Sequence, residues 1–363
     1  AYRIEMEIGR GDMGTVYLAT RDDKEFDQKV AVKLVKRGMD TDYILRRFRQ
    51  ERQILASLEH PFIAGLIDGG TSPDGRPYFV MELVLGKTLY EYADEKRLNL
   101  RERLKLFLRV AESVAFAHQN FVIHRDLKPS NILITGQGLP KLLDFGIAKL
   151  LNPDLIHETQ EPTATAMRMM TPEYASPEQV SGDFVTSATD QYSLGVLLYE
   201  IVTGHRPYLL ENRSPLEIAK VICERPPAVP SQIIESPNQL INANKFSLEP
   251  MSVEAVLRNR KTSAETLKIE LESGLDAILL QSLNKEAHRR YGSVEQFSED
   301  IGRFLKGQPI KAKQFYQPLH QSDATGETGG APRQKTLAVL PFKLLSIGAG
   351  NGGRNSSDTG DEF

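Results

Sequence analysis

The sequence contains one cysteine, Cys223, among its 363 residues. A single thiol excludes a disulfide within the chain and any cysteine-rich metal site. We expect Cys223 to be a buried, small apolar side chain. So little cysteine fits a reducing compartment, and we expect the chain to be cytoplasmic. No run of 18 or more apolar residues is present, so we also expect no membrane span.

An excess of charge of either sign is also missing. The chain has 45 Lys and Arg against 48 Asp and Glu, a formal net charge of -3. Nucleic-acid-binding domains usually carry a clear basic excess, so nucleic acid is not an expected partner. The composition, 40% hydrophobic and 26% charged, is that of a globular protein. The sequence begins with Ala1 in a strand-like pattern, and we expect it to be a piece of a longer protein.

Strand patterns come first along the chain and helical patterns follow. Residues 1–82 contain four short apolar or alternating runs, and helical periodicity appears between them at 42–58. The runs are Tyr2–Glu7, Val16–Ala19, Val30–Val35 and Tyr78–Leu83. From residue 83 to about 226 the pattern is mostly helical, with loops near His124 and Asp144. This order predicts an α+β chain with two lobes.

Later segments differ in composition. Residues 226–250 are rich in Pro, Ser and Asn and predict an irregular loop, and helical patterns return at 252–305. Residues 313–334 have the mixed polar, Pro and Gly content of a linker. The run TLAVLPF at 336–342 then predicts a strand.

Three glycines near the start of the chain have the spacing of a phosphate-binding loop. Gly9, Gly11 and Gly14 stand between two strand patterns. Because glycine has no Cβ, backbone amides at such positions can come close to phosphate groups. A strand follows Gly14, which argues against a dinucleotide-binding fold, where a helix N-terminus holds the pyrophosphate. The pattern therefore indicates either a glycine-rich flap over phosphates or an ordinary tight hairpin turn.

A lysine, Lys33, closes the apolar run VAVK. It lies 19 residues after Gly14 and 18 residues before Glu51, which falls in the helical pattern. A lysine beside phosphates needs a carboxylate to hold its ammonium group, and Glu51 is a candidate. Taken alone, Lys33 also fits a solvated strand edge, and Glu51 fits a surface charge.

The strongest motif is HRDLKPSN at residues 124–131, followed by Asp144 of a DFG sequence 13 residues after Asn131. Phosphoryl transfer needs cations to neutralise phosphate charge and a group that orients the incoming hydroxyl. Asp126 can accept the hydroxyl proton, and Lys128 can lie near the transferred group. Asn131 and Asp144 supply the hard oxygen ligands that Mg²⁺ prefers. The segment therefore predicts a phosphoryl-transfer site.

In this order, the motifs closely resemble those of the eukaryotic-like (Hanks-type) serine/threonine protein kinases of bacteria. The resemblance covers residues 1–312 and includes Ser-Pro-Glu at 176–178, where the family has Ala-Pro-Glu. It implies a two-lobed protein-kinase fold, with a small β-rich N-lobe at 1–82 and a larger α-helical C-lobe at 83–312. It also implies that Asp190 braces the catalytic loop and that Arg290 pairs with Glu178.

The same resemblance implies a site for ATP with Mg²⁺ or Mn²⁺. Lys33, Glu51, Asp126 and Lys128 match its catalytic positions. Asn131 and Asp144 match its metal ligands, and residues 82–84 match the hinge between the lobes, with Met81 as gatekeeper. The residues implied to bind ATP are Ile8, Gly9, Gly11, Gly14, Val16, Ala31, Lys33, Met81, Glu82, Val84 and Leu133.

Substrates and regulation follow from the resemblance as well. Thr171 matches the threonine that marks Ser/Thr kinases, and Lys128 supports the same choice. Protein substrates with Ser or Thr are therefore implied, together with autophosphorylation at Thr163, Thr165 or both. A homodimer in which one copy phosphorylates the other is an implied partner.

The sequence departs from the family's pattern at Asp12 and at Met170, and its last residues can be interpreted in two ways. Asp12, within the glycine-rich loop, either repels phosphate or points to water, and Met170 replaces the glycine usual before Thr171. Residues 335–363 resemble the start of a TolB-like domain, unless TLAVLPF is a chance strand in a tail. The alternative function is a nucleotide-binding pseudokinase or scaffold that acts through such C-terminal modules.

Overall fold

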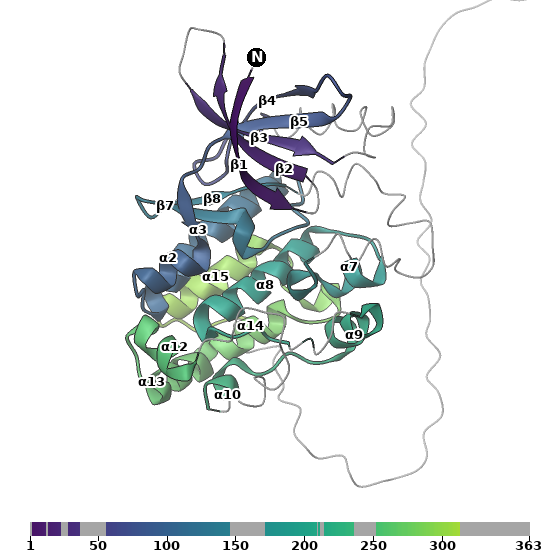
Figure 1. Cartoon of the computed structure of the whole chain (residues 1–363). Helices are drawn as coiled ribbons and strands as arrows, with labels where there is room; N and C mark the ends of the chain where they lie inside the picture. The colour runs from purple at the N-terminus through teal and green to yellow at the C-terminus, as the bar shows by residue number, and fades with distance from the viewer. Residues whose placement is uncertain are drawn as a thin grey trace, which may run out of the picture. The chain divides into compact units, whose positions relative to one another are not determined.

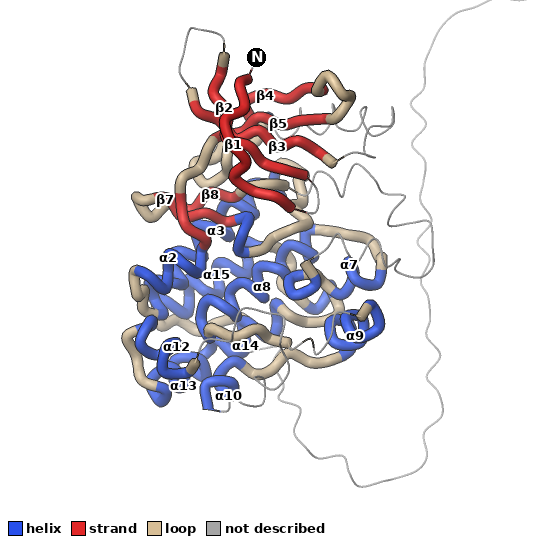
Figure 2. The backbone as a smooth tube through the Cα atoms, viewed as in Figure 1, coloured by secondary structure: helices blue, strands red, loops and turns tan. Residues whose placement is uncertain are grey.

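The computed structural model describes residues 2–11, 14–22, 28–36, 56–145, 171–208, 210, 214–235 and 252–312. Strands form a smaller lobe and helices form most of a larger one (Figures 1 and 2). This arrangement confirms the α+β, two-lobed fold expected from the sequence.

Five antiparallel strands form the sheet of the smaller lobe, in the order β1-β2-β3-β5-β4. They are β1 (Tyr2–Gly11), β2 (Gly14–Arg21), β3 (Lys29–Val35), β4 (Leu66–Thr71) and β5 (Pro77–Glu82). The four predicted strands are confirmed with small shifts at their ends. Strand β4 was not predicted, because the Asp-Gly-Gly run in its sequence, LIDGGT, is typical of a turn and breaks the alternation of a strand.

The register of this sheet places several expected ATP-binding residues on one face. Val16 pairs with Lys33, and Ala31 pairs with Met81. Cross-strand partners share a face, and so do residues two apart in one strand, such as Ala31 and Lys33. The four residues therefore lie on the same face. The other face holds a separate apolar cluster of Ala19, Val30, Val32 and Val80.

Helices dominate the larger lobe. The first are α2 (Leu89–Glu95), α3 (Leu100–Gln119), α7 (Pro177–Ser181), α8 (Ser187–Thr203), α9 (Pro215–Ala219) and α10 (Pro230–Glu235). The last are α12 (Val253–Arg260), α13 (Ala264–Glu270), α14 (Asp276–Ser282) and α15 (Val294–Leu305). Short 3₁₀ turns are η1 (Pro129–Asn131), η2 (Pro172–Tyr174) and η5 (Ala287–Arg289), and π-helical turns are η3 (Lys220–Glu224) and η4 (Leu271–Leu275).

Two parts of the sequence-based assignment in this lobe were wrong. Residues 83–226 include a three-stranded sheet, formed by β6 (Gly86–Thr88), β7 (Ile132–Thr135) and β8 (Pro140–Leu142). Strands of three or four residues are too short to show a period of two. Helix α10 lies inside the expected loop at 226–250, because Asp276 accepts hydrogen bonds from the backbone and side chain of Ser231.

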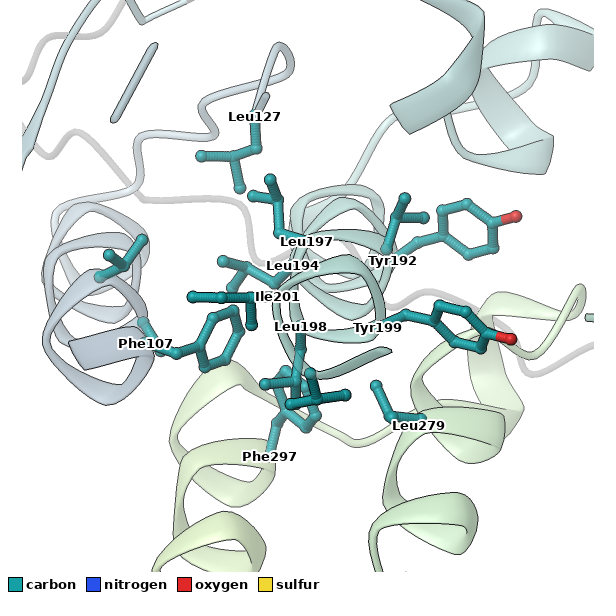
Figure 3. Packing of buried hydrophobic residues seen from close by; sticks show 14 of the residues in the cluster. Phe107, Leu127, Tyr192, Leu194, Leu197, Leu198, Tyr199, Ile201, Leu279 and Phe297 are labelled. Atoms are coloured by element: carbon teal, nitrogen blue, oxygen red, sulfur yellow. The ribbon is translucent and has the colours of Figure 1, made fainter. Parts of the chain in front are cut away.

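Helix α8 forms the centre of the larger lobe. Leu194, Leu198 and Ile201 are fully buried between α3, α14 and α15 (Figure 3). The rings of Phe107 and Phe297 meet edge-to-face beside them, with centroids 5.9 Å apart. None of the described helices is long and apolar enough to cross a membrane.

Cys223 is only partly buried, in contrast to the expectation for this residue. It lies in the surface turn η3, where its Sγ is 3.5 Å from Ser181 Oγ and 3.7 Å from the Pro177 carbonyl oxygen. Val221 and Ile222 of the same turn are buried, so Cys223 lies at the edge of the buried face of η3.

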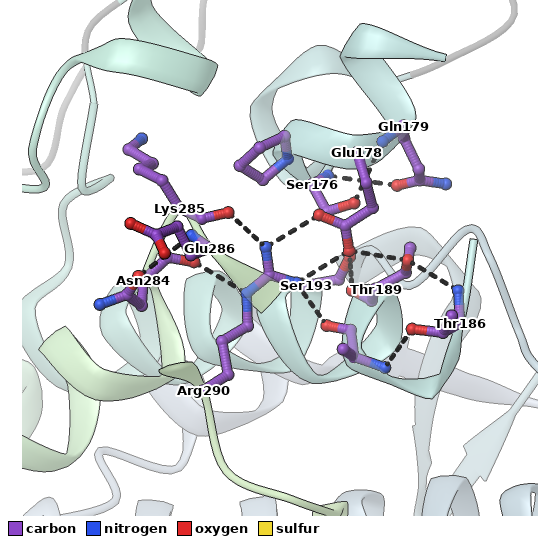
Figure 4. A network of polar contacts seen from close by, with 12 residues as sticks. Ser176, Glu178, Gln179, Thr186, Thr189, Ser193, Asn284, Lys285, Glu286 and Arg290 are labelled. Atoms are coloured by element: carbon purple, nitrogen blue, oxygen red, sulfur yellow. Dashed lines mark hydrogen bonds and ion pairs between the residues drawn. The ribbon is translucent and has the colours of Figure 1, made fainter. Parts of the chain in front are cut away.

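A buried ion pair joins α7 to the segment before α15 (Figure 4). Both terminal nitrogens of Arg290 lie 2.8 Å from the Glu178 carboxylate, which also accepts a hydrogen bond from Thr189. Burial alone would raise the pKa of Glu178, but the hydrogen bond and charge of Arg290 outweigh it and lower the pKa. The pairing implied by the resemblance is therefore present.

Glu178→Gln is expected to lower the free energy of unfolding by about 3–5 kcal/mol, because it leaves a buried guanidinium without its counter-charge. Urea unfolding followed by circular dichroism measures this change. Glu299→Gln is the control, since it removes one carboxylate from an exposed pair with Arg303 and should have a much smaller effect. An unfolding midpoint equal to that of the wild type in Glu178→Gln would contradict the assignment.

His205, directly after α8, gives a prediction about pH. Burial, and then the charge of Arg260, lower the pKa of His205 to about 4 from 6.5. Between these values the unfolded chain binds a proton that the folded chain does not, so the free energy of unfolding falls by about 3 kcal/mol as pH drops. We expect His205→Gln to flatten this dependence in urea unfolding from pH 7 to pH 4, with His288→Gln as an exposed control. A slope unchanged by His205→Gln would contradict the prediction.

Candidate active site

The catalytic loop is attached to α8 through one carboxylate. Asp190 accepts hydrogen bonds from the backbone amides of His124 and Arg125, at 2.7 and 2.8 Å, and from His118 Nε2 at 2.8 Å. Arg125 has a left-handed backbone conformation, with φ 65°, which is unfavourable for a side chain of this size. By accepting both hydrogen bonds, Asp190 fixes this strained turn immediately before Asp126. The expectation that Asp190 braces the catalytic loop is therefore confirmed.

Burial by itself would raise the pKa of Asp190, which is fully enclosed. The hydrogen bond and charge of His118 and the contacts with His124 outweigh that effect, so the pKa lies below its ordinary value. Asp190 is therefore an ionised acceptor of hydrogen bonds at neutral pH.

His124 connects the catalytic loop to the segment that carries Asp144. Its ring is fully buried, with Nε2 2.9 Å from the Leu143 carbonyl oxygen. Its Nδ1 accepts from the Asp126 amide at 3.3 Å. These two bonds require a neutral ring protonated at Nε2, and burial favours that form by lowering the pKa of His124. The His124 ring thereby links the backbone of Asp126 to the backbone of Leu143, the residue before Asp144.

The predicted base, lysine and amide lie together. Lys128 Nζ is 2.8 Å from Asp126 Oδ2 and 3.3 Å from Thr171 Oγ1. Asn131 Nδ2 donates to the backbone oxygen of Asp126 at 2.8 Å and to its carboxylate at 3.2 Å. Leu127, between Asp126 and Lys128, is buried against the core (Figure 3), so the two polar neighbours face away from it. Four residues predicted from two separate motifs thus meet at one point.

Lys33 reaches this centre from the other lobe. Its Nζ lies 2.9 Å from Asp144 Oδ1, and both side chains are largely buried. Among the residues that the structure describes, Asp144 is the carboxylate that contacts Lys33. Glu51, the partner expected for Lys33, lies outside the described residues. Asp144 has φ 49°, a second left-handed conformation at a residue of the site.

The glycine-rich hairpin of β1 and β2 lies beside β3, the strand that carries Lys33. Gly9 pairs with Val16, and Gly11 pairs with Gly14 across the turn. A Cβ on Gly14 would lie 2.2 Å from the Leu34 carbonyl oxygen, so no other residue fits there without moving the backbone. The close packing of Gly14 against the Leu34 backbone explains why this position of the motif is a glycine. Asp12 lies outside the described residues.

The other expected ATP-binding residues lie in strands β1, β5 and β7 or directly after β5. Met81 and Glu82 end β5, and Val84 follows in the connection to the larger lobe. Leu133 alternates with two fully buried residues of β7, so its side chain faces away from the core of the lobe. Ile8 is 47% exposed on β1.

The expected phosphorylation sites and one departure from the family cannot be placed. Thr163 and Thr165, together with Met170 before Thr171, lie outside the described residues.

Contacts not predicted from the sequence also support the site. Lys141 of β8 lies 2.8 Å from Glu82, whose carboxylate also accepts from the Gly65 amide at 3.3 Å. Gln179 donates to the Arg125 carbonyl oxygen at 2.8 Å. Each contact joins positions more than 15 residues apart, and nothing in the local sequence marks these residues.

The oxygen-bearing side chains of the site could hold a divalent cation. No group of three or more His, Cys, Asp or Glu side chains able to hold a metal occurs in the part of the chain that the structure describes. Asn131 and Asp144 offer two hard oxygen groups beside Asp126. Mg²⁺ commonly takes one or two protein oxygens and completes its shell with phosphates and water. The residues therefore fit Mg²⁺ bound together with a nucleotide.

Comparison with known proteins agrees with this geometry. A family model described as "Protein kinase domain" matches residues 2–300. The serine/threonine-protein kinase PknB of Mycobacterium leprae is 32% identical over 346 residues, which cover 93% of this chain and 49% of PknB. The serine/threonine-protein kinase PrkC of Bacillus subtilis is 34% identical over 284 residues, covering 76% of this chain and 41% of PrkC. The chain thus spans less than half the length of these curated relatives.

Solved structures show the same fold. The crystal structure of the Mycobacterium tuberculosis PknI kinase domain superposes with a TM-score of 0.53, at 24% identity. The match covers 84% of this chain and 96% of that domain. Residues 335–363 lie beyond the family model's match, and these comparisons give no support to a TolB-like start there.

Proposed function

This chain belongs to the protein kinase family, and from that premise we propose that it transfers the γ-phosphoryl group of ATP to Ser and Thr hydroxyls of proteins. The observation that carries the proposal is that Asp126, Lys128 and Asn131 contact one another, while the backbone of Asn131 bonds to Leu143, next to the Asp144 that pairs with Lys33. These side chains come from both lobes and from three separate motifs.

Each side chain has a task in this transfer. Asp126 accepts the proton of the incoming hydroxyl, and the hydrogen bond from Asn131 orients its carboxylate. Lys128, beside the base, stabilises negative charge on the transferred group. Its contact with Thr171 supports the choice of Ser and Thr over Tyr. Lys33 positions phosphate oxygens when ATP replaces its contact with Asp144.

Asn131 and Asp144 would hold Mg²⁺ or Mn²⁺, which when bound neutralises phosphate charge. ATP would lie against the sheet face that carries Val16, Ala31 and Met81. The glycine hairpin would cover its phosphates, and the remaining expected contacts are Ile8, Glu82, Val84 and Leu133.

The test is transfer of label from [γ-³²P]ATP to a generic protein substrate, with and without EDTA. We expect Mg²⁺-dependent labelling that EDTA abolishes and added Mg²⁺ restores. Nucleotide binding without any transfer would favour the pseudokinase scaffold, which the complete set of transfer residues does not support.

Autophosphorylation at Thr163, Thr165 or both is expected after incubation with Mg-ATP. A phosphate carries about -1.5 to -2 charges at pH 7, and a guanidinium such as that of Arg125 can bind it bidentately. Mass spectrometry locates the sites, and the Thr163→Ala/Thr165→Ala variant should lose activity. Thr266→Ala, at an exposed position of α13, is the control. Unmodified threonines together with a fully active double variant would contradict this switch.

Other expectations from the sequence remain predictions. They are the homodimer for phosphorylation in trans, the cytoplasmic location, and a domain limit near residue 312 followed by a linker at 313–334. The TolB-like start at 335–363 is retained only as a sequence resemblance.

A further inference from the structure

The C-terminal ends of α2 and α12 meet in the larger lobe (Figure 1). One buried guanidinium joins them. Arg103 donates to the Ala93 and Leu98 carbonyl oxygens, at 3.1 and 2.7 Å, in and just after α2. It also donates to the Asp94 carboxylate at 2.6 Å and to the Asn259 carbonyl oxygen of α12 at 3.4 Å. Groups from both helix ends are therefore within hydrogen-bond reach of one side chain.

Four exposed cations lie at these joined ends, and we call them the basic patch. They are Lys96, Arg97, Arg258 and Lys261. Each is at most two residues along the chain from a group that contacts Arg103, so the four residues lie close together. Within the described part of the chain, none of the four forms an ion pair with a carboxylate.

The acids at the end of α2 have other partners. Glu95 pairs with Lys87, and the charge of Lys96 lowers the pKa of Glu95 less than Lys87 does. Asp94 is bound to the buried guanidinium of Arg103. Neither carboxylate is therefore free to neutralise the basic patch.

The buried charge next to the basic patch has the same sign. Arg260 is 1% exposed and donates to the Val202 and Ile201 carbonyl oxygens at 2.7 and 2.9 Å. Burial, and then the charge of Arg103, lower the pKa of Arg260, whereas the charge of Asp94 opposes the shift. Two buried guanidiniums thus lie near one carboxylate, and their excess positive charge adds to that of the exposed cations.

The surface favours an acidic protein segment over two other anionic partners. Binding to a membrane surface uses large apolar side chains beside the cations, and residues 93–98 and 256–261 include no exposed one. Nucleic acid needs a surface that neutralises many phosphates, whereas the whole chain has a net charge of -3. A short run of Asp or Glu needs only a local group of cations.

We propose that the basic patch binds an acidic segment of protein substrates, away from the residue that is phosphorylated. The inference rests on the proposed kinase function. Helix α2 follows β6 directly, and β6 pairs with β7, which begins after Asn131 of the catalytic loop. A substrate held at the basic patch therefore has its Ser or Thr at a raised local concentration near Asp126.

The first experiment uses synthetic peptides with one Ser acceptor, a Gly-Ser linker of about 4, 12 or 24 residues and a final segment of Glu or of Gln. For the wild-type full chain, we expect the Glu segment to lower KM at least about fivefold at one of the longer linkers, with kcat almost unchanged. The shortest linker is the control for Glu close to the acceptor. Raising NaCl from about 50 to about 300 mM should remove most of the difference, because exposed charges are screened.

Matched variants locate the effect. Arg97→Gln/Arg258→Gln should raise the KM of the Glu peptide toward that of the Gln peptide, and Arg97→Glu/Arg258→Glu should abolish the difference. Arg3→Gln/Arg225→Gln removes two exposed arginines elsewhere and should keep the difference. An equal KM for the Gln peptide in all of these variants shows that they are folded.

A second experiment measures binding without phosphoryl transfer. Fluorescence anisotropy of a labelled Glu-segment peptide is recorded with the full chain and no ATP, beside vesicles containing phosphatidylglycerol and a labelled single-stranded oligonucleotide. We expect saturable binding of the peptide that weakens at least about fivefold in Arg97→Glu/Arg258→Glu. Tighter binding of the vesicles or the oligonucleotide, lost in the same variant, would assign the surface to that partner and overturn the inference.

The two experiments separate failure of the inference from failure of the proposed function. An active wild type with the same KM for Glu and Gln peptides at every linker length overturns the inference and leaves the kinase function intact. A difference that persists in Arg97→Glu/Arg258→Glu overturns it as well. Binding of the Glu-segment peptide without phosphorylation of any peptide or protein overturns the proposed function, and with it the role of the basic patch in choosing substrates.

Discussion

Replacing Asp126 by Asn is expected to preserve ATP binding and to lower kcat by about 10²–10⁴-fold, because a positioned general base is lost. The amide has nearly the same shape as the carboxylate and can keep a contact with Asn131, but it cannot take the proton of the hydroxyl. Steady-state kinetics with a protein substrate measure kcat, and titration with ATP measures binding.

A matched control is Asp183→Asn, the same chemical change at an exposed position after α7. It should leave both quantities unchanged. An Asp126→Asn variant that retains more than half of the wild-type kcat would show that another group accepts the proton.

The second large effect is expected for Lys33→Met, which should lower kcat/KM by about 10²–10³-fold, because a donor to phosphate oxygens is lost. The ammonium now lies 2.9 Å from Asp144, so the variant also frees that carboxylate. Lys29→Met, at an exposed position of the same strand, is the control and should have little effect. Equal losses in the two variants would mean that Lys33 acts only through the stability of β3.

The proposed role of Glu51 can be tested in the same assay. Glu51→Gln should lower activity less than Lys33→Met, and the two effects should be non-additive if the residues form one ion pair. Strict additivity would mean that Glu51 is a surface charge and that another group, such as Asp144, holds Lys33.

Contacts between expected site residues could be predicted from the sequence where the residues lie in one short motif. Asp126, Lys128 and Asn131 fall within six residues, so their mutual positions are largely set by local geometry. Alternation along β3 places Ala31 and Lys33 on one face, whereas their pairing with Met81 and Val16 depends on the register between strands.

Contacts between distant segments could not be predicted in this way. The pair of Glu82 with Lys141, 59 residues apart, depends on how the lobes pack. Helix α10 forms in a Pro- and Ser-rich segment because Asp276, 45 residues after Ser231, caps its start. Strands β6 to β8 exist through pairing with each other, and their few residues carry no periodic signal.

Phosphoamino-acid analysis of a protein substrate labelled from [γ-³²P]ATP tests the central claim most directly. The full chain is incubated with Mg²⁺, labelled ATP and the substrate, beside the Asp126→Asn variant. The account predicts labelled phosphoserine or phosphothreonine with the wild type and almost none with Asp126→Asn. Absence of label, label only on tyrosine, or equal labelling by both proteins would contradict it.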